Sequence, residues 1–373
     1  MKLTIDRSRL LKLLNTVNVA IGSKSPTPAF LNFKLEMVED GLIVLGSDNE
    51  LTIKSFLPIM DGEKQIISNY EQGSTLISAK LLLDIVRKLA NQTVTIEIID
   101  DVIVQISDEQ VNFKLNSMRA EEYPDLDLFV SGEEVTFDSE DFKKIISQTA
   151  FAASTKEVRP ILTAVNVKAV NNQIEFVATD SYRLAKKIYE SDKKYNFEAN
   201  IPVKALVEVS KLLEEDSLSL YISQNKVVFK FGETYVFSRL ISGDFPKTSR
   251  MIPDNYPFVL RVDASKFVNA MERVSLLVVE KERVCKLNLD MNSVEVSSRS
   301  EQIGSARETI DMYEYEGNRF SISYNVDYVS EAIKACKSSD VILSFAGEMN
   351  AFKVTSTDDE TIVQIVTPVR SYY

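Results

Sequence analysis

Apolar residues recur at helical spacing in three stretches of the chain, and each stretch follows a few strand-like residues that end in aspartate. The three aspartates are Asp6, Asp138 and Asp263. Aspartate suits this position because its carboxylate accepts hydrogen bonds from the first free backbone amides of a helix. The pattern therefore predicts three equivalent strand–helix units. Their helices are expected over 7–17, 139–149 and 264–274.

A second amphipathic stretch lies in each third of the chain, and a segment rich in strand-forming residues follows it. Alternating runs with hairpin signals separate the two helices of each third. This order of elements contains no long β-α-β alternation, so it predicts an α+β fold with antiparallel sheets. The second helices are expected over 80–90, 203–213 and 325–336.

Several landmarks repeat at a constant offset. Asp6 and Asp138 are 132 positions apart, and the turn residues Asp48 and Asp180 are separated by the same distance. Agreement of several landmarks in one order indicates an internal duplication. We therefore expect three similar domains, which cover 1–127, 128–254 and 255–373.

Composition is that of a soluble globular protein. The 373 residues are 45% hydrophobic, and no apolar run is long enough to span a membrane. The N-terminal segment carries charges where a signal peptide needs an apolar run, so we expect a cytoplasmic protein without membrane contact. Cys285 and Cys336 are too few for a disulfide framework. We expect two buried thiols, with a bond between them as the alternative.

The residue types that most enzymes need are scarce. Histidine is absent, which removes the commonest general base, the usual zinc ligand and every nucleophile that depends on imidazole. The 11 glycines form no loop of the kind that cradles phosphates. We therefore expect no metal, no cofactor and no catalytic residues.

The predicted helices are the basic part of an acidic chain. The formal charge of the chain is −12, yet the segment 7–16 carries Arg7, Arg9 and Lys12 with no acidic residue. Phosphate attraction normally drives nucleic-acid binding, and a strongly acidic protein opposes it. Segregated charge would give the protein a basic lining and an acidic exterior. An enclosing geometry would then hold a strand with little net attraction.

The chain resembles the β subunit of bacterial DNA polymerase III, the family of replicative sliding clamps. The resemblance covers the whole chain and rests on several landmarks in order. They are Met1–Ile5, Ala120–Asp127, Ala178–Ala185, Phe245–Pro246 with Arg250 and Pro253, and Thr367–Arg370.

This resemblance implies three similar clamp domains, each with two helices packed on antiparallel sheets. It implies a head-to-tail homodimer that closes into a ring around duplex DNA, with the helices lining the hole. Such a ring confers processivity on the polymerase and has no catalytic site of its own. The implied partners are the replicative DNA polymerase, the clamp loader and other proteins that carry a clamp-binding motif.

The family also has a pocket between the second and third domains for a short peptide of these partners. Apolar side chains would take the aliphatic and aromatic anchors of the peptide, and Arg183 and Arg250 would hold its polar atoms. Asp180 is expected to fix the turn beside them, as Asp48 does in the first domain. The pocket carried over by motif comprises Leu162, Thr179, Ser181, Tyr182, Arg183, Leu184, Pro246, Arg250, Met251, Tyr328, Val366, Pro368, Val369 and Arg370.

The sequence departs from the family pattern around this pocket. Tyr182 stands where histidine is common, so we expect a bulkier rim that does not respond to pH near neutrality. Tyr372 and Tyr373 extend past Arg370, and they either flank the pocket or fray.

The resemblance also implies contacts with DNA and between the two chains. The candidate contacts with phosphates are Lys24, Lys80, Lys156 and Arg159, and they would be weak, salt-dependent and blind to base sequence. The dimer contact would join the first domain of one chain to the third domain of the other. Edge strands within 102–113 and 294–309 are the candidates. Leu276 and Leu277 are either apolar anchors of this contact or ordinary core residues.

Two other classes of function stay open at this point. A carboxylate-dependent hydrolase would need Asp48 and Asp180 to meet in one cleft, and their positions in separate repeats oppose this. A protein-binding repeat scaffold without a nucleic-acid role is the other alternative, and the segregation of charge disfavours it.

Overall fold

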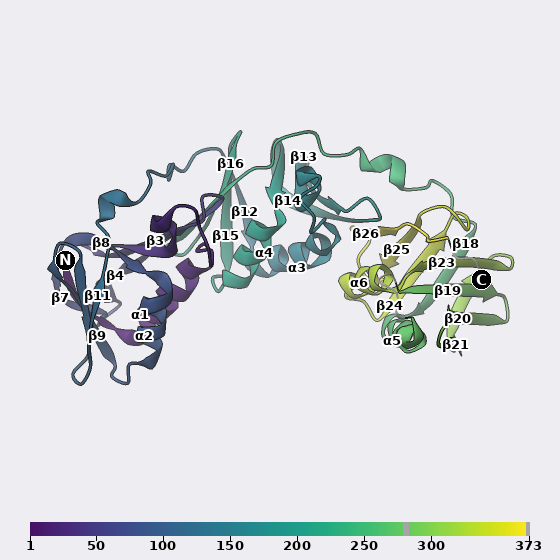
Figure 1. The fold of residues 1–373 in the computed structure, drawn as a ribbon. Coiled ribbons are helices and arrows are strands. Elements are labelled where there is room, and N and C mark those ends of the chain that lie inside the picture. Colours follow the sequence, from purple (N-terminus) through teal and green to yellow (C-terminus); the bar gives the residue numbers. More distant parts are fainter. Residues whose placement is uncertain (279–282, 371–373) are drawn as a thin grey trace. The chain divides into compact units, whose positions relative to one another are not determined.

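The computed structural model describes residues 1–278 and 283–370, and of Arg250 it describes the backbone alone. Contacts within the chain define two compact units, and Figure 1 labels many of their helices and strands. Unit 1 combines Met1–Phe142 with Glu208–Leu240, and unit 2 combines Lys143–Val207 with Ile241–Tyr373. This division passes through the expected second domain, so the expected domain boundaries stay a prediction.

Six α-helices lie among the described residues, close to the positions that the apolar pattern predicts. The predicted caps are confirmed as well. Asp6 accepts a hydrogen bond from the Ser8 amide (3.0 Å), Asp138 accepts bonds from two amides of the first turn that follows it, and Asp263 accepts one from the Lys266 amide (2.7 Å). The helices are α1 (Arg7–Asn18), α2 (Ala79–Lys88), α3 (Ser139–Thr149), α4 (Val203–Leu212), α5 (Ala264–Val274) and α6 (Val326–Cys336).

Unit 1 is built on two large antiparallel sheets. The helices α1 and α2 pack against each other and against strands of both sheets, so their apolar faces close the core. One sheet has the order β11 (Asn112–Asn116), β10 (Ile103–Ser107), β9 (Thr93–Asp100), β1 (Lys2–Asp6), β7 (Ile67–Glu71). The other has the order β12 (Glu133–Asp138), β15 (Ser217–Ile222), β16 (Lys226–Phe231), β17 (Thr234–Arg239), β4 (Leu51–Pro58), β3 (Gly41–Ser47), β2 (Asn32–Met37), β8 (Gly73–Ser78). A small hairpin joins β5 (Met60–Asp61) and β6 (Lys64–Gln65).

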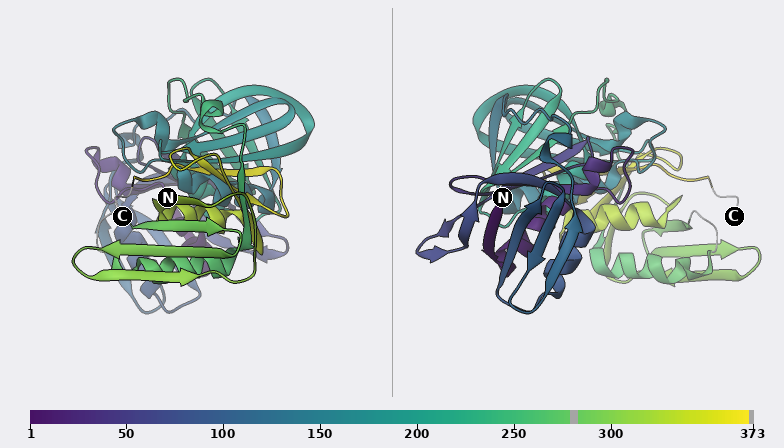
Figure 2. Two further views of the ribbon diagram at one scale, coloured as in Figure 1. Left: turned by 90° about the vertical axis from the view of Figure 1, so that its right-hand side faces the viewer. Right: turned by 60° about the vertical axis from the view of Figure 1, so that its left-hand side comes forward.

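Unit 2 repeats this design with a seven-stranded and a four-stranded antiparallel sheet. In the left view of Figure 2 the green strands of the smaller sheet lie in front of α5 and α6, which pack against each other. The larger sheet has the order β13 (Ala164–Thr179), β14 (Arg183–Pro202), β26 (Ile362–Val366), β25 (Phe352–Ser356), β24 (Asp340–Phe345), β18 (Phe258–Asp263), β22 (Tyr313–Glu316). The smaller has the order β21 (Gly304–Thr309), β20 (Ser293–Ser300), β19 (Val284–Asp290), β23 (Phe320–Asn325).

One strand pair joins the first predicted repeat to the second, and another joins the second to the third. The two pairs align equivalent residues. In unit 1, Ile53 on β4 lies opposite Val236 on β17. In unit 2, Ala185 on β14 lies opposite Gln364 on β26. Ile53 and Ala185 are 132 positions apart, the offset of the repeat. The duplication is therefore visible in the pairing of strands as well as in the helices.

Both cysteines are buried as free thiols, as expected. Burial raises the pKa of Cys285 and of Cys336 to about 12, so neither thiol ionises near neutral pH. None of the helices among the described residues is long and apolar enough to cross a membrane.

Candidate functional site

A tight turn between β13 and β14 carries the first group of candidate side chains. The Asp180 carboxylate accepts hydrogen bonds from the backbone amides of Tyr182 (2.9 Å) and Arg183 (3.0 Å). The amide of Ser181 donates to the Thr179 hydroxyl (3.1 Å), and Ser181 has a φ of +79°. These bonds hold a left-handed conformation that a non-glycine residue rarely adopts. Asp180 thus has the structural use that the sequence predicts.

Asp48 fixes the equivalent turn of unit 1 in the same way. Its carboxylate accepts hydrogen bonds from the amides of Glu50 (3.0 Å) and Leu51 (2.8 Å). Each of the two aspartates is therefore occupied by its own turn. This arrangement leaves no acid–base pair for the hydrolase alternative, which needs two carboxylates in one cleft.

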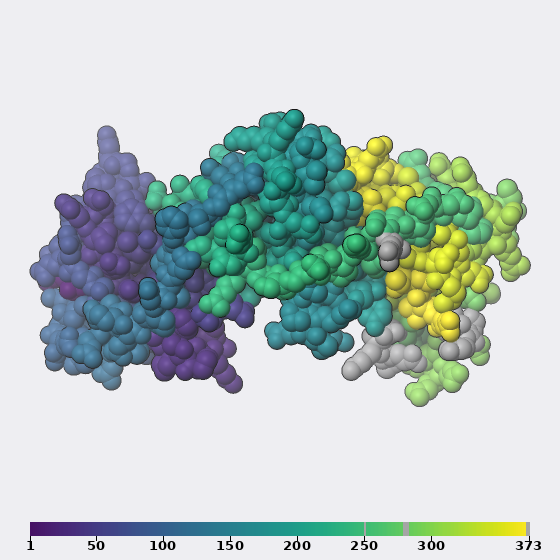
Figure 3. Space-filling view, turned by 90° about the horizontal axis from the view of Figure 1, so that it is seen from above, coloured from purple at the N-terminus to yellow at the C-terminus, as the bar shows by residue number. Residues whose placement is uncertain are grey.

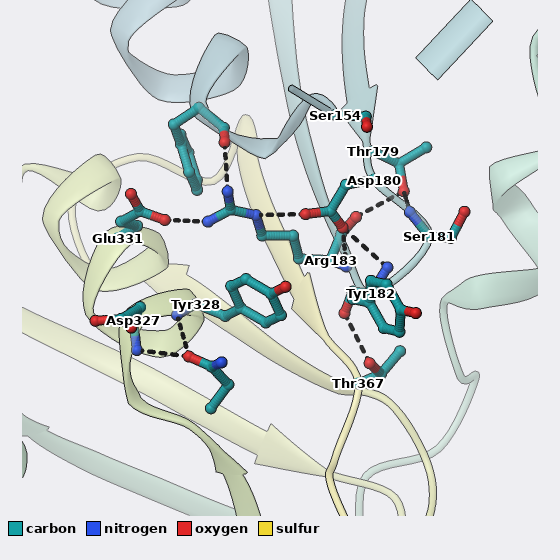
Figure 4. A network of polar contacts seen from close by, with 12 residues as sticks. Ser154, Thr179, Asp180, Ser181, Tyr182, Arg183, Asp327, Tyr328, Glu331 and Thr367 are labelled. Atoms are coloured by element: carbon teal, nitrogen blue, oxygen red, sulfur yellow. Dashed lines mark hydrogen bonds and ion pairs between the residues drawn. The ribbon is translucent and has the colours of Figure 1, made fainter. Parts of the chain in front are cut away.

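Arg183 is the most constrained side chain at this site, and only 12% of it is exposed. Its Nε donates to Asp180 (3.1 Å), its Nη1 donates to Glu331 on α6, and its Nη2 donates to the carbonyl of Phe151 (2.7 Å). The guanidinium carbon also lies 5.3 Å from the centroid of the Phe151 ring and 4.7 Å from that of the Tyr328 ring. Figure 4 shows Arg183 beside Tyr328. All three nitrogens therefore donate within the protein, and Arg183 positions its neighbours rather than reaching outward.

Tyr182 is the exposed member of this group, with 62% of its surface accessible. Its ring stacks beside that of Tyr328, with 6.5 Å between centroids and 24° between planes. Its carbonyl accepts hydrogen bonds from the amide (2.9 Å) and the hydroxyl (2.8 Å) of Thr367. The backbone of Tyr182 is thus tied to the C-terminal segment while its ring stays open to solvent.

An apolar cluster lies next to the turn. Val177, Leu184 and Ile365 are buried at its centre. Met251 and Phe245, from the segment that precedes β18, pack on it half-buried. Figure 3 shows this green segment beside the yellow C-terminal residues. The remaining members are Ile252, Ala351 and Val363.

The other predicted pocket residues are divided between surface and core. Pro246 and Arg370 are exposed, and Pro368 and Val369 are half-buried. Leu162 is buried in a short 3-10 helix, and Val366 belongs to the core of the C-terminal strands. Arg250 (its side chain), Tyr372 and Tyr373 lie outside the described residues.

A separate cavity opens beside the C-terminal segment and has a volume of about 230 Å³. It includes Val369 and Arg370 of the predicted set, and Met349 on its wall is 56% exposed. The backbone amide of Val369 donates to the carbonyl of Ser323 (2.8 Å), which fixes the segment along this wall. The other lining residues are Lys286, Ser321, Ile322, Ser323 and Glu348.

Sequence reasoning missed Glu331, Phe151 and the strand residues Val177 and Ile365. The two strand residues gave no clear signal, because the neighbours of each on β13 and β26 are buried as well and the burial does not alternate there. Glu331 and Phe151 had no local signal, because they meet Arg183 only through the packing of α6 and of a short 3-10 helix on β14.

All four candidate DNA-contacting residues are exposed. Lys24 and Lys156 lie in equivalent loops, 132 positions apart, and each loop leads into a 3-10 helix that begins with proline. Arg159 lies in the second loop, and Lys80 begins the outer face of α2. The structure therefore presents these four side chains to solvent.

The basic excess of the helices is smaller than the sequence count suggests. Arg9 on α1 forms an ion pair with Asp61 of the small hairpin, and Lys12 pairs with Glu214 (2.5 Å). Acidic residues outside the helix therefore neutralise two of the three basic groups of α1. Lys80 and Lys88 on α2 form no ion pair with any described residue, so α2 is the more basic surface.

The candidate dimer strands lie at sheet edges. β11 ends the five-stranded sheet of unit 1, and β21 ends the four-stranded sheet of unit 2. Leu276 is 78% exposed, so it is not a core residue, and Leu277 is half-buried. An exposed leucine beside a free edge strand is typical of a surface that another chain covers.

Comparison with known proteins shows the family of the chain. Models of the DNA polymerase III beta subunit match its N-terminal domain at residues 1–127, its central domain at 136–247 and its C-terminal domain at 249–370. The beta sliding clamp of Bacillus subtilis is 35% identical over 380 residues, and that of Staphylococcus aureus 33% identical over 377, each with both chains fully covered.

Solved structures agree with these likenesses. The DNA polymerase sliding clamp of Bacillus subtilis has a TM-score of 0.95 with the chain at 35% identity, with both chains fully covered. The beta chain of Streptococcus pneumoniae DNA polymerase III has a TM-score of 0.94 at 28% identity, covering 99% of this chain and 100% of its own.

The fold and these relatives define the class of protein as a sliding clamp, with three clamp domains of mixed helices and antiparallel sheets. The chain belongs to the DNA polymerase III beta subunit family. It acts in DNA replication as a processivity clamp and not as an enzyme.

Proposed function

We propose that this clamp subunit forms a head-to-tail homodimer that closes a ring around duplex DNA. The ring would tether the replicative polymerase and other partners through the site at Tyr182, and the clamp loader would open it. We place the protein in the cytoplasm, to which its free cysteines are suited. The observation that carries this proposal is the register of the strands that join the repeats.

The cap aspartates align the three repeats strand by strand, because Asp6, Asp138 and Asp263 each pair with the first strand after the second helix of their repeat. When the strands are counted from these caps, Phe113 on β11 is equivalent to Val236 on β17 and to Gln364 on β26. The strand at the other side of each repeat can be aligned through the hairpin to which it belongs. In this alignment Ala306 on β21 is equivalent to Ile53 on β4 and Ala185 on β14.

Both junctions inside the chain thus use the same two strand positions. A third junction of this kind would need β21 of the third repeat and β11 of the first, and both strands are sheet edges. Pairing of β21 with β11 of a second copy would continue the series. Such a head-to-tail contact gives a closed ring when it forms twice between the same two copies. In this register Ala306 lies opposite Phe113, and Ser305 lies opposite Lys114.

Contact with DNA is expected to be electrostatic and weak. Lys24, Lys80, Lys156 and Arg159 offer exposed cations in a chain whose formal charge is −12. Retention must therefore come from topology more than from affinity, since the acidic bulk opposes binding to phosphates.

The test is retention on circular and on linearised plasmid after loading, followed by a wash at high salt. Retention on the circle with loss from the linear form supports encirclement. Equal loss of the protein from both forms of the plasmid would contradict the proposal. Site-specific attachment of a bulky block to both ends of the linear plasmid is the control, because it should restore retention to a ring that slides off free ends.

For the peptide site, we propose that the apolar cluster around Leu184 and Met251 takes the aliphatic and aromatic anchors of a partner peptide. Met251→Ala should weaken binding of a polymerase tail peptide about tenfold or more, because it removes a half-buried side chain from that cluster. The exposed Met60→Ala in unit 1 is the matched control and should leave peptide affinity unchanged. Equal affinities of the two variants would show that the pocket is misplaced.

A further inference from the structure

Four groups form a continuous stack at the partner site, and only the last of them is open. The guanidinium of Arg183 lies over the ring of Phe151 and over the ring of Tyr328. The ring of Tyr182 lies beside that of Tyr328 (Figure 4). The inner members are held by hydrogen bonds and packing. Tyr182 ends the stack with an aromatic surface that is 62% exposed.

Among the described residues, the charged groups that form ion pairs within the stack sum to a negative charge. The single guanidinium of Arg183 is shared by the carboxylates of Asp180 and Glu331. This triad therefore carries one excess negative charge, and the Glu331 side chain is 49% exposed. The neighbouring Asp327 is balanced by its ion pair with Arg283, so it does not change this sign.

The backbone that carries the exposed ring is fixed. Thr367 donates twice to the carbonyl of Tyr182, and Asp180 accepts from its amide. A tyrosine ring on a fixed backbone has few side-chain torsions to lose, so it costs little conformational entropy when a ligand stacks on it. Its negative quadrupole, together with the excess carboxylate within a Debye length, attracts a cation and above all a planar guanidinium.

We infer that Tyr182 is a specificity-determining residue, which selects partner peptides that carry an arginine beside their apolar anchors. This inference rests on the proposed peptide site and names the chemistry of its polar end. Arg183 does not hold the peptide; it is a positioning residue that keeps Tyr328 and Tyr182 in line. The arginine of the partner stacks on the open face of Tyr182.

The test uses the full chain and three short synthetic peptides, measured by fluorescence anisotropy. All three contain a leucine–phenylalanine anchor pair. The residues that flank this pair on both sides are arginine in the first peptide, glutamine in the second and glutamate in the third. The arginine peptide should bind about two- to fivefold tighter than the glutamine peptide, the range of an exposed cation–π contact. The glutamate peptide should bind most weakly, and the difference should shrink as salt is raised.

Variants of the exposed ring separate this role from a structural one. Tyr182→Phe keeps the aromatic face and should keep the preference for arginine. Tyr182→Ala should lose that preference while the glutamine peptide binds as before. Tyr70→Ala, at an exposed tyrosine of unit 1, is the matched control and should change neither affinity.

The outcomes distinguish the two levels of the proposal. Binding of all three peptides without a preference for arginine, or a preference that survives in Tyr182→Ala, overturns the role of Tyr182 and leaves the peptide site standing. Failure of every peptide to bind overturns the peptide site itself, and this inference with it.

Discussion

The ammonium group of Lys187 on β14 lies 2.6 Å from a carboxylate oxygen of Asp359, which is 172 residues later in the chain. Lys187 also donates to the hydroxyl of Thr361 (2.5 Å), and Lys144 approaches the same carboxylate at 3.3 Å. Only 9% of the Lys187 side chain and 17% of the Asp359 side chain are exposed. The pair thus ties β14 to the loop before β26 inside unit 2.

Removal of one partner of this pair should destabilise unit 2. Lys187→Met should lower the free energy of unfolding by about 2–4 kcal/mol, because it leaves a largely buried carboxylate with a weaker partner. Lys186→Met is the control, since the ion pair of Lys186 with Glu175 is more exposed and should contribute less than about 1 kcal/mol. Urea unfolding at neutral pH measures both. Equal effects of the two substitutions would contradict the structural role of Lys187.

The same pair should make stability depend on acid. Burial raises the pKa of Asp359, but hydrogen bonds from Lys187 and Thr361 and the charge of Lys187 together lower it well below its usual range. A carboxyl group whose pKa is lower in the folded state stabilises that state above its unfolded pKa of about 4 and loses this contribution as the pH falls. The difference in stability between the wild type and Lys187→Met should therefore be constant from pH 8 to about pH 5 and shrink below about pH 4.

A buried glutamine on α3 offers the opposite prediction. Gln148 is fully buried on α3, and neither atom of its side-chain amide has a hydrogen-bond partner among the described residues. Gln148→Met keeps the shape and removes the unpaired amide, so it should raise the free energy of unfolding by about 1 kcal/mol. Gln364→Met should instead be destabilising, because the side-chain amide of Gln364 donates to the backbone carbonyl of Gln148 (3.0 Å). Loss of stability in Gln148→Met would show that the amide has a partner, such as an internal water.

Much of this fold could be predicted from periodicity alone. Helical spacing after Asp6, Asp138 and Asp263 predicts the helices and their caps, because both are local properties of the chain. The turn at Asp180 was predictable for the same reason. For its neighbour Arg183 the resemblance implies contact with a peptide, which stays a prediction. Nothing local in the sequence indicates the carboxylate of Glu331, which is 148 residues away.

The burial of individual strand residues was the second feature that could not be predicted from the sequence. The resemblance places Val366 in the pocket because of its neighbours in the closing motif, and the structure buries its side chain in the core of the C-terminal strands. A strand that is buried on both faces has no alternation, so its sequence does not show which side chains reach the surface. For Leu276 the sequence left core and interface equally open, because a leucine at the end of an amphipathic helix fits both.

The proposed ring closure can be tested by a disulfide between two copies. Ser305 and Lys114 are exposed and lie opposite each other in the proposed register, so Ser305→Cys combined with Lys114→Cys should form a covalent dimer on mild oxidation. Arg307→Cys with Lys114→Cys is the control, since that diagonal pair is too far apart for a disulfide. Non-reducing electrophoresis measures both. The native thiols should not compete, because both are buried with a pKa of about 12. Efficient crosslinking of the diagonal pair would refute the register.

Contact with phosphates can be tested at the two equivalent loops. Lys24→Glu with Lys156→Glu should weaken direct binding to duplex DNA and flatten its dependence on salt, because two phosphate contacts are lost. Lys193→Glu with Lys194→Glu changes the net charge equally at exposed positions of β14, where its register with β13 shifts, and should have a smaller effect. Filter binding across a salt series gives the two slopes. Equal loss in both variants would mean that only net charge matters and that the loops make no specific contact.

Leu276 gives the most direct test of the proposed dimer surface. Leu276→Lys places a charge at an exposed apolar position beside the edge strand β21, so it should convert the dimer to a monomer without lowering the thermal stability of the chain. Leu81→Lys is the matched control, because Leu81 is an exposed leucine (48%) on α2 of unit 1. Sedimentation at micromolar concentration distinguishes the two masses, and thermal unfolding checks the fold. A Leu276→Lys protein that stays dimeric would remove this residue from the interface, and a Leu81→Lys protein that dissociates would show that any added charge suffices.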